Sequence, residues 1–294
     1  MRAAISGATA RLAAAGVPSP RVDAIALAEH ALGVPQLILA VTPDVPDGFE
    51  AAYAALIERR EGREPLQHIT GYAAFRHLTL RVAPGVFLPR PETEVVAQRA
   101  IDEARRLVAG GSQPLVVDLC SGSGVIALSV AVEAPGSHVV AIEVDPAAVE
   151  LARANASELG PGVRLRFEVG DVTDPALLAE LNGTVDVVIS NPPYIPDDAV
   201  PLDIEVAGHD PARALFGGGR DGLDVPGGVV AAAARLLRGG GLFVMEHADV
   251  QGPAVRDLVD RTGAFDTATT HPDLTGRDRF VEARRRLPEG HSPD

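Results

Sequence analysis

The segment Asn191-Pro192-Pro193-Tyr194 joins residue types that an ordinary turn does not require, and it follows directly on the apolar run 185–190. Its two prolines lack a backbone N–H and fix φ at about −65°, so the segment is stiff. It can present two acceptors, the side-chain oxygen of Asn191 and the carbonyl of Pro192, to the two N–H bonds of one planar NH2 group. Orienting such a weakly nucleophilic nitrogen toward a methyl donor can lower the barrier by about 7–11 kcal/mol. We therefore predict that Asn191, Pro192 and Tyr194 are catalytic and that residues 191–194 bind the substrate.

Tyr194 is expected to pack against the target group and close the site. An apolar plug with an exposed hydroxyl is compatible with that role. No strong general base is needed, because an alkylated amide nitrogen becomes acidic and can release its proton to a neighbouring acceptor or to water. The alternative for the whole segment is a rigid surface turn.

A second polar segment, DLCSGSG at 118–124, follows the apolar run 114–117. Glycines let the backbone approach a ligand closely, and Glu143, about 20 positions further on, can accept hydrogen bonds from ribose hydroxyls. The pattern indicates an adenosine-type cofactor. Taken alone it is ambiguous, because Gly122-x-Gly124-x-x-Ala127 also fits the dinucleotide fingerprint, and a tight strand-helix turn is the structural alternative.

Two carboxylates favour S-adenosyl-L-methionine over a dinucleotide. Asp118 precedes the glycines, where it could meet a ligand ammonium but would repel a pyrophosphate. Asp171, next to Val172, could accept from an adenine amino group, although an Asp before DPALLAE is also typical of a helix N-cap. The predicted cofactor-binding residues are Asp118, Cys120, Ser121, Gly122, Ser123, Gly124, Glu143, Asp171, Val172 and Asn191.

The elements that must position these residues change type along the chain. Residues 3–60 have the three- and four-residue apolar spacing of short helices, and 75–89 alternates as a β-hairpin with a Pro84-Gly85 turn. From 114 onward apolar strands alternate with helices, which indicates a parallel sheet with ligands at the carboxyl ends of its strands. Strands are expected at 114–119, 138–144, 163–169, 185–190, 241–247, 264–270 and 279–284.

Two other segments allow two interpretations each, and a third allows one. Residues 87–94 could line the transfer pocket or form a linker in which Thr93 caps a helix. Residues 217–222, GGGRDG, could be a mobile lid, although a solvated loop is favoured. Glu246-His247 is interpreted as a satisfied strand end.

Composition narrows the class of partner. The 294 residues carry a net charge of −14 and include no lysine, which disfavours a stable nucleic-acid partner and excludes a lysine-containing P-loop. Cys120 is the only cysteine, so no intrachain disulfide can form. The histidines lack metal-ligand spacing, so no metal is expected. No long apolar run or leader is apparent, so we expect no membrane partner and a cytoplasmic location.

DLCSGSG together with SNPPYIP resembles the class I S-adenosylmethionine-dependent methyltransferases that modify planar NH2 groups. REPLQHITGYAAFRHLTLRVAPGVFLPRPETE at 63–94, DPARALFGGGRDGLD at 210–224 and the late TGRDRFVEARR narrow the resemblance to the HemK/PrmC family. The resemblance covers nearly the whole chain. Two departures are visible, because Cys120 stands where many members have glycine and Asp210 where the pattern often has Glu.

The resemblance implies a class I, Rossmann-like α/β methyltransferase with a mostly parallel seven-stranded sheet. It implies methyl transfer from S-adenosyl-L-methionine to the glutamine of the Gly-Gly-Gln motif in peptide chain release factors, with S-adenosyl-L-homocysteine as product. The expected domains are 1–74, helical and substrate-docking; 75–92, a hairpin connector; 93–286, the methyltransferase domain; and 287–294, a disordered tail. A ribosomal-protein glutamine methyltransferase, a nucleic-acid exocyclic-amine methyltransferase and a non-enzymatic release-factor scaffold remain alternatives.

Overall fold

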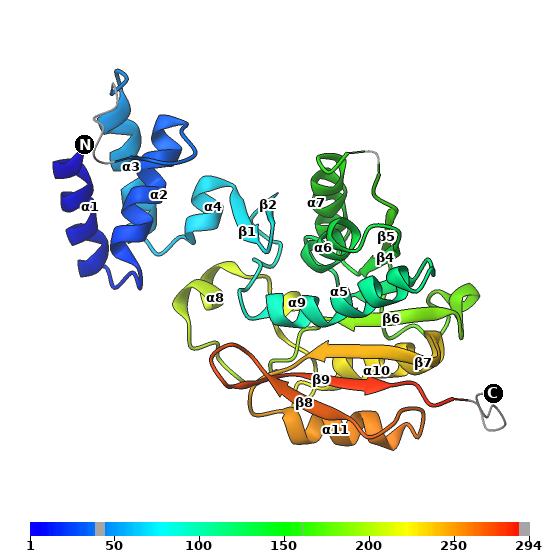
Figure 1. The fold of residues 1–294 in the computed structure, drawn as a ribbon. Coiled ribbons are helices and arrows are strands. Elements are labelled where there is room, and N and C mark those ends of the chain that lie inside the picture. Colours follow the sequence, from blue (N-terminus) through cyan, green and yellow to red (C-terminus); the bar gives the residue numbers. More distant parts are fainter. Residues whose placement is uncertain (39–44, 161, 288–294) are drawn as a thin grey trace. The chain divides into compact units, whose positions relative to one another are not determined.

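The computed structural model describes residues 1–38, 45–160 and 162–287. These residues form two compact units (Figure 1). The described residues within 1–72, 82–85 and 200–210 form the helical unit, and those within 73–81, 86–199 and 211–287 form the sheet unit. The helical unit thus takes in 200–210, a stretch that lies beyond residues 191–194 in the chain. Of the predicted disordered tail, 288–294 lies outside the described residues.

The elements of the helical unit are α1 (Arg2–Ala14), α2 (Pro20–Leu32), α3 (Phe49–Glu61), α4 (Leu66–Thr70) and α8 (Ile204–His209). In this unit, α1 to α4 pack around one apolar core, to which α8 contributes no buried residue. The core includes Leu12, Leu27 and Ile57, all at most 1% exposed. Helix α2 begins with Pro20 at its first turn and ends at Gly33, whose φ of 65° suits glycine. Helices are therefore present where the apolar spacing predicts them.

A buried ion cluster ties α8 to α3 within the helical unit. Arg60 is 4% exposed and donates to Asp23 at 2.7 Å and to Glu205 at 2.8 Å. Arg63 donates to the same Glu205 oxygen at 2.7 Å. Breaking one partner of such a buried set is strongly destabilising, because it leaves an uncompensated charge. Glu205 therefore holds the segment 200–210 in the helical unit.

The sheet unit is built on a seven-stranded sheet of order β5-β4-β3-β6-β7-β9-β8. Strands β3 to β7 pair in parallel, whereas β9 pairs antiparallel with both β7 and β8. The chain order reverses at β3 and β6, which is where ligands of doubly wound sheets bind. The strands are β3 (Leu115–Leu119), β4 (His138–Glu143), β5 (Leu165–Val169), β6 (Val185–Ser190), β7 (Leu237–Glu246), β8 (Thr269–Pro272) and β9 (Asp278–Arg284).

Helices cover both faces of this sheet (Figure 1). Because successive strand residues point to opposite faces, Val116 packs into one apolar cluster and Val117 into the other. The first cluster contains α5 (Thr93–Ala109), α6 (Val125–Glu133) and α7 (Pro146–Ser157), and the second contains α10 (Asp224–Leu236) and α11 (Gly252–Arg261). The short helices η1 (Ala179–Leu181) and α9 (Ala212–Leu215) complete the described helices. The predicted class, a mostly parallel seven-stranded α/β sheet preceded by helices, is confirmed.

Two strand boundaries and the hairpin differ from the prediction. Strand β7 begins at Leu237, before the expected 241, and β8 lies at Thr269–Pro272 instead of 264–270. The hairpin pairs β1 (Tyr72–Phe75) with β2 (Leu78–Arg81), so its turn falls at Arg76-His77 and not at Pro84-Gly85. Arg76 has a φ of 54° and donates to Glu133 and to the Glu94 carbonyl, contacts that fix the turn from outside. Local spacing could not predict those partners.

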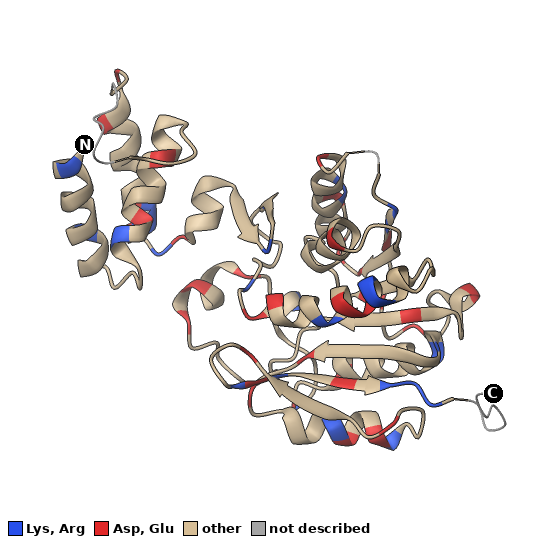
Figure 2. Cartoon of the chain, viewed as in Figure 1, with Lys and Arg blue, Asp and Glu red and all other residues tan. Residues whose placement is uncertain are grey.

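Charge is mixed along the elements. Figure 2 shows basic positions interspersed with acidic ones along α5 and α11. Among the residues that the structure describes, no helix is long and apolar enough to cross a membrane.

Candidate active site

The register of the parallel strands brings the predicted segments to one edge. Leu119 pairs with Ile142 and with Ser190, so the glycine loop lies between the ends of β4 and β6. Ser190 pairs in turn with Met245, which places Asn191 level with Glu246 at the end of β7. The carboxyl edge therefore carries the cofactor segments and the 191–194 loop on adjacent strands.

Backbone hydrogen bonds shape the glycine loop. The Ser121 N–H donates to the Ile142 carbonyl at 2.9 Å, and the Gly122 N–H donates to Glu143 Oε2 at 2.8 Å. The other Glu143 oxygen accepts from the Asp145 N–H at 2.9 Å. Each carboxylate oxygen keeps a second lone pair for a ligand hydroxyl. Glu143 thus both shapes the loop and remains able to accept from a ribose.

Gly124 is required where the loop enters α6. Its φ of 83° disfavours other residues, and a Cβ there would lie 2.9 Å from a ring carbon of Phe167 and 3.0 Å from the Ala152 methyl. The glycine therefore serves helix packing. Ser123 beside it is 3% exposed, and its carbonyl accepts from Asn155 at 3.4 Å.

Asp118 has the position expected for the group that meets a ligand ammonium. It is fully buried, and its Oδ2 accepts from the Ala127 N–H of α6 at 3.0 Å. Its Oδ1 is buried without a hydrogen-bond partner, and so is Ser121 Oγ. Burial raises the pKa of Asp118 to about 8, and the charge of Glu143 adds to the rise. A buried acceptor without a partner is costly, and a cationic ligand would satisfy it, so these residues fit the expected cofactor.

Asp171 and Val172 follow β5 but differ in burial. Asp171 is exposed, and its Oδ1 accepts from both the N–H and the hydroxyl of Thr173. These bonds lower the pKa of Asp171 and form a turn, with no α-helix following. The helix N-cap interpretation of Asp171 was therefore wrong. Val172 is 7% exposed and packs in the apolar cluster on the α10 side.

The two departures from the family pattern have different settings. Cys120 has a φ of 60°, in the left-handed region that favours glycine, which gives a physical reason for glycine in other members. Asp210 lies in the helical unit and ends α8 as its C-cap residue.

In the 191–194 loop, side chains from three elements converge. Asn191 Nδ2 donates to Thr93 Oγ1 at 3.1 Å, and the Thr93 hydroxyl donates to Glu246 Oε2 at 2.8 Å. The Tyr194 hydroxyl lies 3.4 Å from the other Glu246 oxygen. Burial and the nearby Glu246 charge raise the pKa of Tyr194, so it stays a phenol. Its hydroxyl thus faces Glu246, and the interpretation that leaves it exposed was wrong.

Residues 217–222 also support the loop, because they pack against the backbone of Tyr194 and Ile195. The Gly217 N–H donates to the Ile195 carbonyl at 2.9 Å, and a Cβ at Gly222 would lie 2.2 Å from the Tyr194 carbonyl oxygen. Gln251 Nε2 donates to the carbonyls of Tyr194 and Asp221, both at 2.8 Å. GGGRDG is therefore solvated only at its tip: Arg220 and Asp221 are exposed, whereas Gly217 and Gly222 are buried against the loop that carries Tyr194.

Sequence reasoning missed Gln251 and gave Glu246 no role in the site. For Thr93 it offered residues 87–94 as a possible lining of the transfer pocket, and Thr93 does contact Asn191. Thr93 was expected to cap a helix if 87–94 were a linker, but α5 has Glu92 as N-cap and no side-chain cap bond. The interpretation of Glu246-His247 as a satisfied strand end holds for Glu246, whose partners are Thr93 and Tyr194, but not for His247, whose Nε2 is buried without a hydrogen-bond partner. A carboxylate at the carboxyl end of a buried strand was the available signal for Glu246. Gln251 carried no signal in the sequence.

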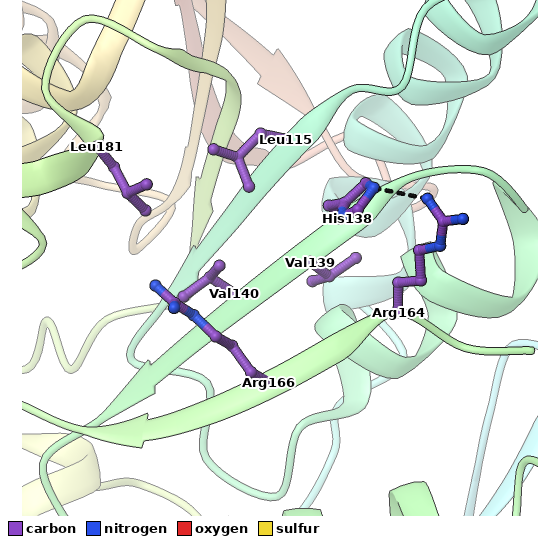
Figure 3. Close-up of a pocket in the computed structure, with 7 residues that line it drawn as sticks. All are labelled: Leu115, His138, Val139, Val140, Arg164, Arg166 and Leu181. Carbon is purple, nitrogen blue, oxygen red and sulfur yellow. Dashed lines mark hydrogen bonds between the residues drawn. The ribbon is translucent and has the colours of Figure 1, made fainter. Parts of the chain in front are cut away.

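A separate pocket opens at the opposite edge of the sheet. It is lined by residues at or near the amino ends of β3, β4 and β5 and by Leu181 of η1. His138 faces Arg164, whose Nη1 is 2.8 Å from its ring nitrogen (Figure 3). In open α/β sheets ligands bind at the carboxyl ends of strands, so this pocket is not the candidate site.

Comparison with known proteins shows the family. A family model described as PrmC N-terminal domain matches residues 3–71, and one described as methyltransferase small domain matches 91–220. The release factor glutamine methyltransferase of Mycolicibacterium smegmatis is 48% identical over 97% of this chain and 98% of its own length. This chain belongs to the release factor glutamine methyltransferase family. The predicted resemblance to the HemK/PrmC family is thereby confirmed.

Other relatives of this family match over a similar extent. The release factor glutamine methyltransferase of Streptomyces coelicolor is 47% identical over 97% of this chain and 98% of its own length. Among solved structures, a T. thermophilus 16S rRNA N2 methyltransferase with AdoMet and guanosine bound has a TM-score of 0.51 and 22% identity, covering 73% of this chain and 50% of that one. That likeness concerns the fold alone.

Proposed function

We propose that this protein transfers a methyl group from S-adenosyl-L-methionine to the side-chain amide nitrogen of the glutamine in the Gly-Gly-Gln motif of peptide chain release factors. The observation that carries the proposal is the Asn191 loop, held at the carboxyl edge beside the glycine loop by Thr93, Glu246 and Gln251. Full-length similarity to the release factor glutamine methyltransferases supports the choice of substrate. An enzyme of release factors would act in the cytoplasm.

Asp118, Glu143 and the glycine loop would hold the cofactor. When bound, S-adenosyl-L-methionine supplies an electrophilic methyl group on a sulfonium. Asp118 Oδ1 would accept from the ligand ammonium, and Glu143 from the ribose hydroxyls. Asp171 and Val172 would line the adenine side, with the exposed Asp171 carboxylate as acceptor and buried Val172 as an apolar wall.

The 191–194 loop would orient the glutamine amide. Because Nδ2 of Asn191 is engaged by Thr93, its Oδ1 is the atom left to accept from the substrate NH2. The carbonyl of Pro192 would accept the second N–H, and the Tyr194 ring would pack on the amide. Holding both hydrogens would direct the nitrogen lone pair at the methyl carbon. Formation of the N–C bond would be matched by cleavage of the S–C bond, which would release S-adenosyl-L-homocysteine, and the nitrogen would lose one proton to an acceptor or water. The loop therefore contributes orientation and requires no strong base.

Mass spectrometry of a release factor incubated with the protein and S-adenosyl-L-methionine tests the proposal. The expected result is a mass increase of one CH2 on the peptide that contains Gly-Gly-Gln, and its absence from a release factor with Gln replaced by Glu. Parallel reactions with ribosomal protein, rRNA and DNA test the other substrates. Methylation of one of these alone would overturn the proposal, and so would a bound but unmodified release factor.

A further inference from the structure

The orientation of the Asn191 side-chain amide is set by a chain of hydrogen bonds that begins at Glu246. The two ends of an Asn amide fill nearly the same space, so only hydrogen bonds distinguish Oδ1 from Nδ2. A reversed Asn191 would direct N–H groups at the substrate NH2, where nothing could accept them. The proposed reaction therefore needs hydrogen-bond partners that prevent Oδ1 and Nδ2 of Asn191 from exchanging places.

Each hydrogen bond between Glu246, Thr93 and Asn191 fixes which group donates in the next one. While Glu246 is ionised, its carboxylate only accepts, so the Thr93 hydroxyl then donates to Glu246 Oε2, 2.8 Å away. Having given its hydrogen, Thr93 Oγ1 can only accept from Asn191, and Nδ2 donates to it at 3.1 Å. Oδ1 of Asn191 is then left for the substrate side.

Water is excluded from the first two members of this chain. Thr93 and Glu246 are each 2% exposed, so no solvent molecule competes for these bonds. Thr93 opens α5 and Glu246 ends β7, and the side chain of Thr93 makes no cap bond to its helix. The other oxygen of Glu246 lies 3.4 Å from the Tyr194 hydroxyl, so Glu246 contacts one end of the 191–194 loop directly and reaches Asn191, at the other end, through Thr93.

We propose that Thr93 and Glu246 are positioning residues for methyl transfer, because together they force Oδ1 of Asn191 to face the substrate amide. This inference rests on the proposed function and extends it to two residues that need not touch the substrate or the cofactor. Burial raises the pKa of Glu246 to about 7, while the bond from Thr93 and the charge of Arg279 oppose the rise and Glu92 adds to it. A protonated Glu246 could donate to Thr93 and release the constraint.

Thr93→Val keeps the shape of the side chain and removes the hydroxyl. We expect kcat to fall about 10- to 100-fold, as expected when a reacting group is misplaced, with KM for the release factor and the cofactor Kd within about twofold. Thr93→Ser restores the hydroxyl and should recover most of the turnover. Thr184→Val, at the opposite end of β6, is the matched control and should behave as the unmodified protein.

Glu246→Gln retains one acceptor oxygen and should lower kcat less than Thr93→Val does. Because both residues act on Asn191, the double variant should be no slower than Thr93→Val alone. Glu246→Gln carries the test if Thr93→Val does not fold. The inference is overturned if Thr93→Val turns over like the Thr184→Val control, if Thr93→Ser is equally slow, or if the losses multiply.

A readout without turnover separates this inference from the proposed function. The side-chain NH2 signal of Asn191, identified by its loss in Asn191→Ala, should have one hydrogen protected from solvent exchange, and Thr93→Val should abolish that protection. If the unmodified protein methylates no release factor, the proposed function fails, but this measurement still tests whether Thr93 and Glu246 orient the Asn191 amide. Equal exchange of both hydrogens in the unmodified protein would show that they do not.

Discussion

The two halves of the candidate site are held in place by different kinds of contact. The cofactor side is shaped by backbone N–H groups and nearby carboxylates, with Gly122 and Glu143 separated by 21 positions and Asp118 and Ala127 by nine. On the substrate side, Thr93 bonds to a residue 153 positions away and to another 98 positions away. The first half thus depends on a local strand-loop-helix design, whereas the second depends on the assembled sheet. Substitutions in the first should affect cofactor binding, and in the second turnover.

Asn191→Ala should give the largest effect, because it removes the side-chain acceptor for the target amide. We expect kcat to fall by about 100- to 1,000-fold, the range seen when one preorganised hydrogen-bonding group is removed. Calorimetry should find the cofactor Kd nearly unchanged. Asn182→Ala, an exposed Asn on the amino side of β6, is the control. Lost cofactor binding with normal turnover would reverse the assignment of the two halves.

Gly222→Ala should disturb the substrate side through the backbone. The new Cβ would lie 2.2 Å from the Tyr194 carbonyl oxygen, so the 191–194 loop must shift. We expect kcat to fall by about 100-fold, because a shift of about 1 Å in the loop is enough to misplace the reacting groups. Gly263→Ala has a similar positive φ of 64° but no atom within 4 Å, so it controls for backbone strain alone. Equal effects of the two variants would show that contact with the loop is irrelevant.

Glu143→Ala should weaken cofactor binding while leaving turnover of the saturated enzyme closer to normal. Both of its carboxylate oxygens accept backbone N–H bonds, so the glycine loop loses its support as well as the ribose acceptor. Charged hydrogen bonds contribute about 1.5–3 kcal/mol each, so a 10- to 100-fold rise in the cofactor Kd is expected. Glu168→Ala, on neighbouring β5, is the control for calorimetry. A change in kcat without a change in the cofactor Kd would contradict the assignment of Glu143 to the cofactor half of the site.

Proton release should accompany cofactor binding. In the free protein the raised pKa of Asp118, about 8, keeps the carboxyl protonated at pH 6–7.5, and a cationic ligand favours the carboxylate. Affinity should therefore rise with pH in this window by up to about tenfold per unit. Calorimetry in buffers of different ionisation enthalpy measures the release, and Asp118→Asn should abolish it. A pH-independent Kd in the unmodified protein would count against Asp118 as the ammonium partner.

Cys120→Gly should have the smallest effect. Relief of the φ of 60° stabilises by about 1 kcal/mol, and the lost apolar contact and greater freedom of the unfolded chain offset that gain. We expect the free energy of unfolding to change by less than about 1 kcal/mol. Cys120→Val places a β-branched residue at the same φ and should destabilise more in chemical denaturation. If the Gly variant is the less stable of the two, backbone strain is not what distinguishes this position.

Much of the fold was predictable from local patterns. Apolar runs separated by helices predict the parallel strands, because such strands are buried on both faces and lose the alternation of a half-exposed sheet. The hairpin was harder, because its turn at Arg76 depends on Glu94 and Glu133, which lie elsewhere in the chain. The boundaries of β7 and β8 shifted for the same kind of reason, since pairing with neighbouring strands sets where an extended segment ends.

By itself, the sequence determined which residue types stand at the strand ends and so predicted their chemistry: glycines and acidic groups for an adenosine-type cofactor, and a stiff Asn-Pro-Pro-Tyr loop for a planar NH2 group. These signals are local, because they depend on residue type and on spacing within one strand-loop unit. Only the tertiary structure decided which groups support that loop. Pairing of Ser190 with Met245 brings Glu246 level with Asn191, and the start of α5 brings Thr93 between them. The pairing register of strands that are distant in sequence is not encoded in the spacing of residues along the chain. This part of the site therefore forms only when the sheet assembles.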